Sequence, residues 1–184
     1  MAIKTFTTGE VLTSANTNTY LANSGLVYVK EQTVGSGVST VTVTNAFSAT
    51  YDSYLITLNR IVCSVDNTDL RLRLGLVAST TVAYNLQYMT IGSNVVSGSS
   101  GTAGAGLIVS FTENGTAGFT SVINVHNPFL TVLTRYQSDW GNNDFNGVYR
   151  GFDNTTTSYT DFMIIPASGT MTGGVITVYG YRKA

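Results

Sequence analysis

Charge is the scarcest property of this 184-residue sequence, in which only 10% of the residues are charged and the formal net charge is −1. There is no surplus of lysine and arginine to neutralise a phosphate backbone, so we expect no nucleic-acid partner. No apolar run approaches the length of a bilayer span, and we expect no membrane insertion. Residues 1–6 lack the apolar region of a signal peptide, which indicates synthesis in a cytoplasm without export.

Cysteine and histidine occur once each, as Cys63 and His126. A single cysteine excludes an intrachain disulfide, and its place in an apolar, strand-like run predicts a buried, inert thiol. Any Ser-His-Asp or Cys-His catalytic group would have to use His126, which the pattern favours as a structural or surface residue at a strand end. A zinc site built from these two residues would lack two further ligands. We therefore expect no enzyme, no metal and no cofactor.

Alternation of apolar and polar residues is abundant by contrast. In residues 69–77, four leucines alternate with two arginines and a glycine, which is typical of a strand with one buried and one solvated face. About ten or eleven such segments are expected, separated by turns rich in Gly, Asn and Ser. The predicted strands cover residues 26–29, 38–44, 54–58, 69–77, 82–91, 107–111, 119–125, 129–136, 148–152, 159–165 and 175–181. This pattern predicts an all-β fold, a single antiparallel β-sandwich, with a jelly roll favoured over an immunoglobulin-like arrangement.

Two connections carry more specific expectations. Residues 92–106 are rich in Gly and Ser and predict a loop. The dipeptide Asn114-Gly115 lies between two apolar runs, and this is the strongest short signal for a β-hairpin. We therefore expect residues 107–111 and 119–125 to pair with each other.

Residues 1–25 differ from the rest of the chain. They show no strand alternation, and a cap at Thr13 or Ser14 predicts a short helix that continues to Leu21. Their few apolar side chains cannot support a core, so the segment either lies against the main domain or docks onto another subunit, and we favour docking. The predicted organisation is an N-terminal arm, residues 1–25, followed by a sandwich domain, residues 26–184.

The arm also carries a sequence resemblance. Its elements are Thr5-Phe6, Gly9-Glu10, Leu12-Thr13 and Asn18-Thr19-Tyr20-Leu21. In this order they resemble the N-terminal segment of many tailed-bacteriophage virion proteins, which are described as tail fibre, minor tail or structural proteins. The closing residues 174–183 are similar to the last strand of such proteins, and the two parts together cover about a fifth of the chain.

The resemblance implies a phage virion protein, assembled in the host cytoplasm, whose arm docks onto other virion proteins of the tail or capsid. It favours a fibre or spike subunit, a homotrimer by analogy with phage fibres, with host cell-surface glycan as a further partner. A capsid decoration protein or head fibre is the alternative, and a free lectin or glycan hydrolase is the third hypothesis. The candidate docking residues are Phe6, Glu10, Val11, Leu12, Asn18, Tyr20 and Leu21.

The aromatic stretch around Trp140 is the candidate for ligand contact. Sugar rings present apolar faces and hydroxyls, so their binding sites combine a flat aromatic ring with amides and carboxylates. Three interpretations remain open: a turn whose tryptophan closes one end of the core, an oligomer contact, or a ligand site. A calcium site at Asp139 and Asp144 lacks the spacing of a recognised loop. The residues of this ligand or interface loop are Tyr136, Asp139, Trp140, Asn142, Asn143, Asp144 and Phe145.

Overall fold

The computed structural model describes residues 7–16, 25–76, 82–91, 96–103 and 106–183. Within these ranges the chain forms one short helix and thirteen strands. Their bounds are α1 (Ser14–Asn16), β1 (Leu26–Thr33), β2 (Val41–Val43), β3 (Ser53–Cys63), β4 (Asp69–Leu74), β5 (Val82–Thr90), β6 (Val96–Ala103), β7 (Leu107–Phe111), β8 (Phe119–His126), β9 (Thr134–Gly141), β10 (Phe145–Asp153), β11 (Phe162–Pro166), β12 (Met171–Thr172) and β13 (Val175–Tyr181). None of the described helical residues forms a segment with the length and apolar character of a membrane span.

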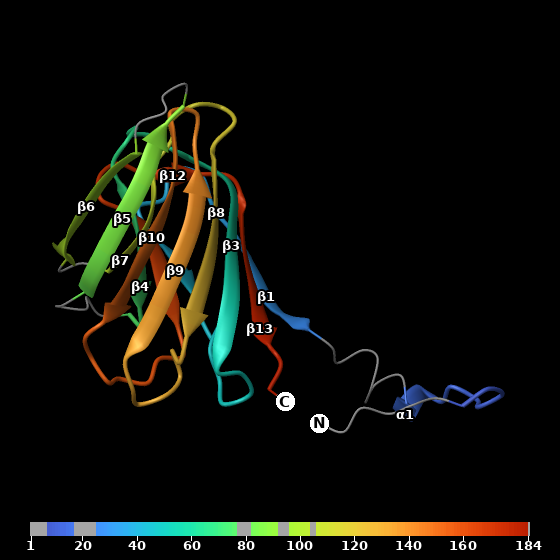
Figure 1. The fold of residues 1–184 in the computed structure, drawn as a ribbon. Coiled ribbons are helices and arrows are strands. Elements are labelled where there is room, and N and C mark those ends of the chain that lie inside the picture. Colours follow the sequence, from blue (N-terminus) through green and yellow to red (C-terminus); the bar gives the residue numbers. More distant parts are fainter. Residues whose placement is uncertain (1–6, 17–24, 77–81, 92–95, 104–105, 184) are drawn as a thin grey trace.

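Two antiparallel sheets pack face to face, which confirms the predicted all-β sandwich (Figure 1). The larger sheet has nine strands in the order β1-β13-β3-β8-β9-β10-β5-β6, with β12 paired to β3. The smaller sheet has four strands in the order β2-β11-β4-β7. The larger sheet therefore extends well beyond the area that the smaller one covers.

The strand pairing follows the connectivity of a jelly roll. β1 pairs with β13, β2 with β11, β3 with β8 and β4 with β7, all antiparallel. This nested pairing, first strand with last, is what results when one long antiparallel hairpin is rolled across two sheets. Two further hairpins, β5–β6 and β9–β10, are inserted into this plan and lie next to β8 in the larger sheet. They widen one layer without a matching extension of the other.

The core lies between the two sheets and follows the predicted period of two. The inward side chains of β3 and β4 are almost completely buried: Tyr54, Ile56, Leu58, Leu70, Leu72 and Leu74. Burial of a large apolar side chain contributes roughly 1.5–3 kcal/mol. Because a register slip of one residue would turn these side chains to solvent, the alternation also specifies the strand pairing.

Glycines on β10 make room for aromatic rings in the inserted half of the core. Gly151 follows Tyr149 at the next inward position, and Tyr149 is 1% exposed. A Cβ atom at Gly151 would clash with the carbonyl oxygen of Ala83 and lie 2.8 Å from the ring of Tyr136. The missing side chain is thus what lets the neighbouring strand and the Tyr136 ring approach this closely.

A bulge in β7 couples the two sheets. The register between β4 and β7 shifts between Leu70 and Arg71, so Val109 has no partner on β4. Its carbonyl oxygen accepts hydrogen bonds from the hydroxyls of Ser121 (3.2 Å) and Ser138, which lie 2.8 Å from each other. A bulge frees backbone groups from the ladder, and buried ones need other partners. The two serines, from the opposite sheet, supply them.

The prediction of a loop over residues 92–106 is wrong at residues 96–103, which form β6. β6 forms within this segment and pairs with β5 from Val82↔Ala103 to Met89↔Val96. Gly and Ser have low strand propensity, but the pairing depends on backbone groups, and small residues suit an edge strand.

The predicted hairpin at Asn114-Gly115 does not form. β7 lies in the smaller sheet and β8 in the larger, so the two strands do not pair with each other. The connection crosses from one layer to the other instead. Glu113, only 3% exposed, accepts hydrogen bonds from the backbone N–H groups of Gly115 (2.6 Å) and Asn143 (3.0 Å). This buried carboxylate ties the crossing to the β9–β10 turn and overrides the local turn preference.

Candidate functional site

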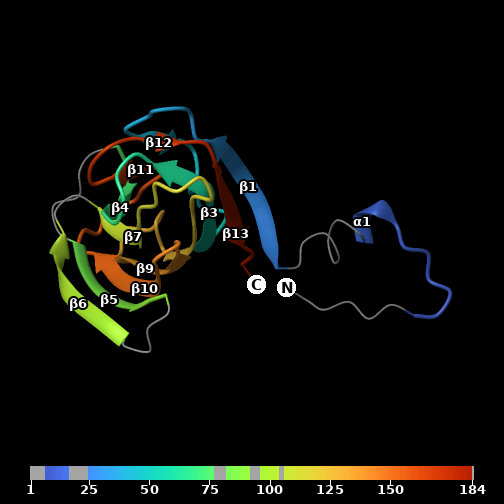
Figure 2. The same cartoon turned by 90° about the horizontal axis from the view of Figure 1, so that it is seen from above.

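The N-terminal arm lies outside the sandwich, as Figure 2 shows for residues 7–16. Val11 is 78% exposed and Leu12 50% exposed. Apolar side chains that find no cover in their own chain mark a surface for contact with another molecule. The candidate docking residues Phe6, Asn18, Tyr20 and Leu21 fall outside the described residues.

Local hydrogen bonds shape the described part of the arm. The N–H of Glu10 donates to the carbonyl oxygen of Thr7 (3.0 Å), and the Glu10 carboxylate accepts from the N–H of Thr7 (3.3 Å). Thr13 Oγ1 accepts from the N–H of Asn16 (3.2 Å), which is the expected cap of α1. The expected continuation of this helix to Leu21 lies outside the described residues. The arm thus has turns of its own but no core.

The first half of β1, at the edge of the larger sheet, is also apolar. On β1 and β13, Leu26 is 45% exposed, Tyr28 60% and Tyr181 38%. The rings of Tyr28 and Tyr179 meet edge to face with centroids 6.2 Å apart. β1 is the end strand of its sheet within the described residues, so its outer backbone edge has no neighbouring strand there. Such an edge is a natural place for pairing with another chain.

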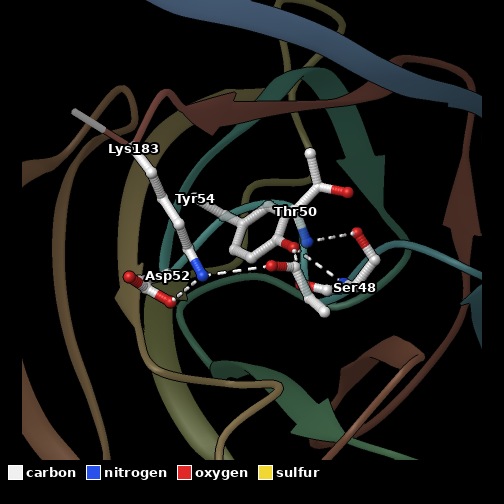
Figure 3. A network of polar contacts seen from close by, with 6 residues as sticks. Ser48, Thr50, Asp52, Tyr54 and Lys183 are labelled. Atoms are coloured by element: carbon white, nitrogen blue, oxygen red, sulfur yellow. Dashed lines mark hydrogen bonds and ion pairs between the residues drawn. The ribbon is translucent and has the colours of Figure 1, made fainter. Parts of the chain in front are cut away.

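The C-terminal end of the chain is fastened beside this edge (Figure 3). Lys183 Nζ lies 2.7 Å from the Asp52 carboxylate and donates to the carbonyl oxygen of Ala49 (3.0 Å). The fully buried Tyr54 hydroxyl donates to the Ser48 carbonyl oxygen (3.0 Å) and accepts from the Ser48 N–H (2.7 Å). The segment from Ser48 to Asp52 and the residue Lys183 are therefore tied to each other at the end of β13, which pairs with β1.

Trp140 lies in the core and not on a loop. It is 5% exposed on β9, and its ring packs against Phe111 (centroids 5.0 Å apart) and Tyr149 (6.0 Å). Tyr136, two positions earlier, is 3% exposed, and the ring of Phe145 also packs against Phe111 (5.9 Å). This placement corresponds to the core interpretation, and it leaves no face of the Trp140 ring open for a sugar.

The polar members of the same stretch are mostly engaged in holding the β9–β10 turn. The side-chain oxygen of Asn142 accepts from the N–H groups of Asp144 (3.0 Å) and Phe145 (2.7 Å). The Asp144 carboxylate accepts from the side-chain amide of Asn67 (3.1 Å). Asp139 is separate from these residues and exposed on the outward face of β9. The described part of the chain contains no group of three His, Cys, Asp or Glu side chains that could hold a metal ion.

A depression of about 620 Å³ lies on the outward face of the larger sheet, where β8, β9, β10, β5 and β6 run side by side. We call it the outer trough. Two rows of outward side chains border it, each row made of residues directly opposite one another on neighbouring strands. The first row is His126, Arg135, Phe152 and Ala83, and the second is Gln137, Arg150, Asn85 and Ser100.

The outer trough carries positive charge. The guanidinium of Arg135 lies 5.7 Å from the centre of the Phe152 ring, a cation–π contact. Among the described residues the ion pairs are Arg71–Asp69 and Lys183–Asp52, so neither Arg135 nor Arg150 is paired with a carboxylate there. This site could not be predicted from the sequence, because its residues come from five strands. Only the strand register shows that they lie together.

His126, at one end of the outer trough, has a serine beside it. Its Nδ1 lies 3.0 Å from the hydroxyl of Ser53, the residue directly opposite on β3. His126 is exposed, and in the described structure no carboxylate orients its other ring nitrogen. In the described part of the chain this serine–histidine pair therefore lacks the third, orienting group of a catalytic triad.

Cys63 is buried, with 1% of its surface exposed, which confirms the expected buried thiol. Burial raises the pKa of this thiol from 9.0 to about 11. The reactive thiolate is therefore rare at neutral pH, and the position suits packing better than chemistry.

No model of a known protein family matches the sequence, and no curated protein matches it significantly. Three features of the molecule bear on its function: the exposed residues 7–16, the apolar first half of β1 and the outer trough.

Proposed function

We propose that this chain is a structural protein of a tailed-phage virion, a fibre or spike subunit joined to the particle by its N-terminal arm. The observation that carries the proposal is the exposure of Val11 and Leu12 on a segment that adds nothing to the core. The sandwich buries its own core without the described part of this segment, so folding does not explain the apolar side chains there. Docking onto a second protein does.

Two further observations support the proposal. The arm resembles the N-terminal segment of tailed-phage virion proteins at Thr5-Phe6, Gly9-Glu10, Leu12-Thr13 and residues 18–21. The β1 edge offers Leu26 and, within the described ranges, a backbone edge without a neighbouring strand to other copies of the chain, which supports self-association, in our proposal as a homotrimer. The broad outward face of the larger sheet then remains available for host-surface glycan.

The test is the deletion of residues 1–22 in a phage that assembles the full protein. We expect a soluble domain with a melting temperature close to that of the full chain, because residues 7–16 add nothing to the core. We also expect this domain to be missing from purified particles. A double variant, Val11→Ser with Leu12→Ser, should reduce incorporation, whereas Thr8→Ser at an exposed position of the same segment should not. Normal incorporation of the shortened chain would rule out the anchoring role.

Capsid decoration is the second candidate within the same class. A charged fraction of only 10% and a net charge of −1 suit dense packing of many copies, because little repulsion separates them. The arm would then clasp capsid subunits. Copy number separates the two assignments, since a decoration protein is present in hundreds of copies and a tail fibre in a few or dozens.

A further inference from the structure

We propose that the outer trough binds an anionic saccharide whose sugar units carry carboxylate groups. The inference rests on the adhesive part of the proposed function and gives it a site and a ligand class. It replaces the Trp140 stretch as the place of contact, because the Trp140 ring is buried whereas the trough is open to solvent.

Charge is the first argument. Arg135 and Arg150 project from adjacent strands on the same face, both are exposed, and neither is paired with a carboxylate in the described structure. A guanidinium presents a planar set of N–H donors that matches a carboxylate in two-point contact. The guanidinium carbon of Arg135 lies 5.7 Å from the centre of the Phe152 ring, and a cation–π contact of this kind uses none of the guanidinium N–H donors on a carboxylate. Two neighbouring arginines without a carboxylate partner in the described structure therefore favour the binding of an anionic ligand.

The neutral lining is the second argument. Asn85, Gln137 and Ser100 lie in the same row as Arg150 and carry amide and hydroxyl groups, and the amide nitrogen of Gln137 also donates to the Asp139 carboxylate (3.4 Å). These groups both donate and accept hydrogen bonds, as sugar hydroxyls require. Neighbouring strands lie about 4.8 Å apart, so four residues of one row span roughly 14 Å, which suits a short oligosaccharide. The volume of about 620 Å³ is typical of a small-molecule site.

Charge also decides against nucleic acid as the occupant. A nucleic-acid strand carries one phosphate per nucleotide and is bound through many lysines and arginines. The outer trough has two arginines, and the whole chain has a net charge of −1. A short saccharide that needs two carboxylate contacts, and otherwise offers hydroxyls to the neutral lining, fits this number of cations.

The experiment is calorimetric titration of the full chain with two acidic probes, hexagalacturonate and oligosialic acid, and with the methyl ester of hexagalacturonate. The ester keeps the sugar chain but removes its charge. We expect binding to at least one acidic probe, weakened by added salt, and at least tenfold weaker binding to the ester where hexagalacturonate binds. The variant Arg150→Gln should weaken the binding about tenfold, because it removes charged hydrogen bonds.

Arg135→Gln should weaken binding similarly. Arg60→Gln is the matched control, since Arg60 is an exposed arginine at the β3 bulge, outside the outer trough. It should bind as the unmodified chain does. All three replacements are at exposed positions, and unchanged melting temperatures would show that they fold.

Several results would overturn the inference. They are no binding of either acidic probe at about 1 mM, equal binding of hexagalacturonate and its ester, or equal effects of Arg150→Gln and Arg60→Gln. The chain without residues 1–22 should keep its saccharide binding. If the probes fail to bind but that deletion still blocks incorporation, the anchoring function stands and only the trough assignment falls.

Discussion

The hydroxyl pair beneath the β7 bulge provides a sharp test of how the two sheets are joined. Ser121 and Ser138 are both fully buried, and both lie within hydrogen-bond distance of the Val109 carbonyl oxygen. Two hydroxyl hydrogens serve three contacts, namely the two to the carbonyl and the one between the serines. Either serine alone can therefore still donate to Val109.

The expected changes in the free energy of unfolding follow from the fact that either serine alone can satisfy the Val109 carbonyl. Ser121→Ala or Ser138→Ala removes one hydrogen bond and leaves the carbonyl satisfied, so each should lower the free energy of unfolding by about 1 kcal/mol. The double variant leaves the buried Val109 carbonyl without a donor, which adds about 1–3 kcal/mol. The double variant should thus be less stable than the sum of the two single effects, by that additional amount.

Urea unfolding is a suitable assay, because Trp140 is the one tryptophan of the chain and is 5% exposed in the folded state. Its fluorescence should report the loss of the core. Ser36→Ala, at an exposed position in the turn after β1, is the control and should change stability by less than about 0.5 kcal/mol. Additive effects of the two core serines within about 0.5 kcal/mol would refute the shared-carbonyl reasoning.

Two further predictions concern packing and pH. Gly151→Ala should cost about 1–3 kcal/mol and lower the melting temperature, measured by calorimetry, because its Cβ would clash with the Ala83 carbonyl; an unchanged melting temperature would contradict the close packing. Burial raises the pKa of Cys63 to about 11, so the folded state keeps its proton where the unfolded state loses it. Its contribution to stability is fully present below about pH 9 and is lost as the pH rises towards 11. Urea unfolding across this range should show a smaller decrease for Cys63→Ala than for the unmodified chain, and equal decreases would contradict the assignment.

Strong alternation was sufficient to predict the central strands. Residues 54–58 and 69–74 each place large apolar side chains at every second position, and burial of one face leaves a single register. The expected continuation of the second strand is wrong at Gly75 and Leu76, because the strand ends at Leu74 and Leu76 is 57% exposed. Weak or conflicting local signals were not sufficient. β6 forms because β5 pairs with it, and the turn at Asn114-Gly115 is redirected by the buried Glu113 carboxylate, whose hydrogen-bond partner at Asn143 is distant in sequence.

Two of the candidate sites also had a local signal in the sequence, and the third had none. That residues 7–16 add nothing to the core was predictable, because a segment with few apolar groups and no alternation has little to bury. The environment of Trp140 had a readable signal, since Tyr136, Ser138 and Trp140 alternate with polar residues and all three face inward. The outer trough had none, because its arginines, amides and Phe152 meet only through pairing across five strands.

Imaging of intact particles by electron cryomicroscopy tests the central claim most directly, because it places both the arm and the sandwich. The proposed function predicts that residues 7–16 contact a neighbouring virion protein while the outward face of the larger sheet projects to solvent. An arm folded against its own sandwich, or particles that lack the protein, would contradict it.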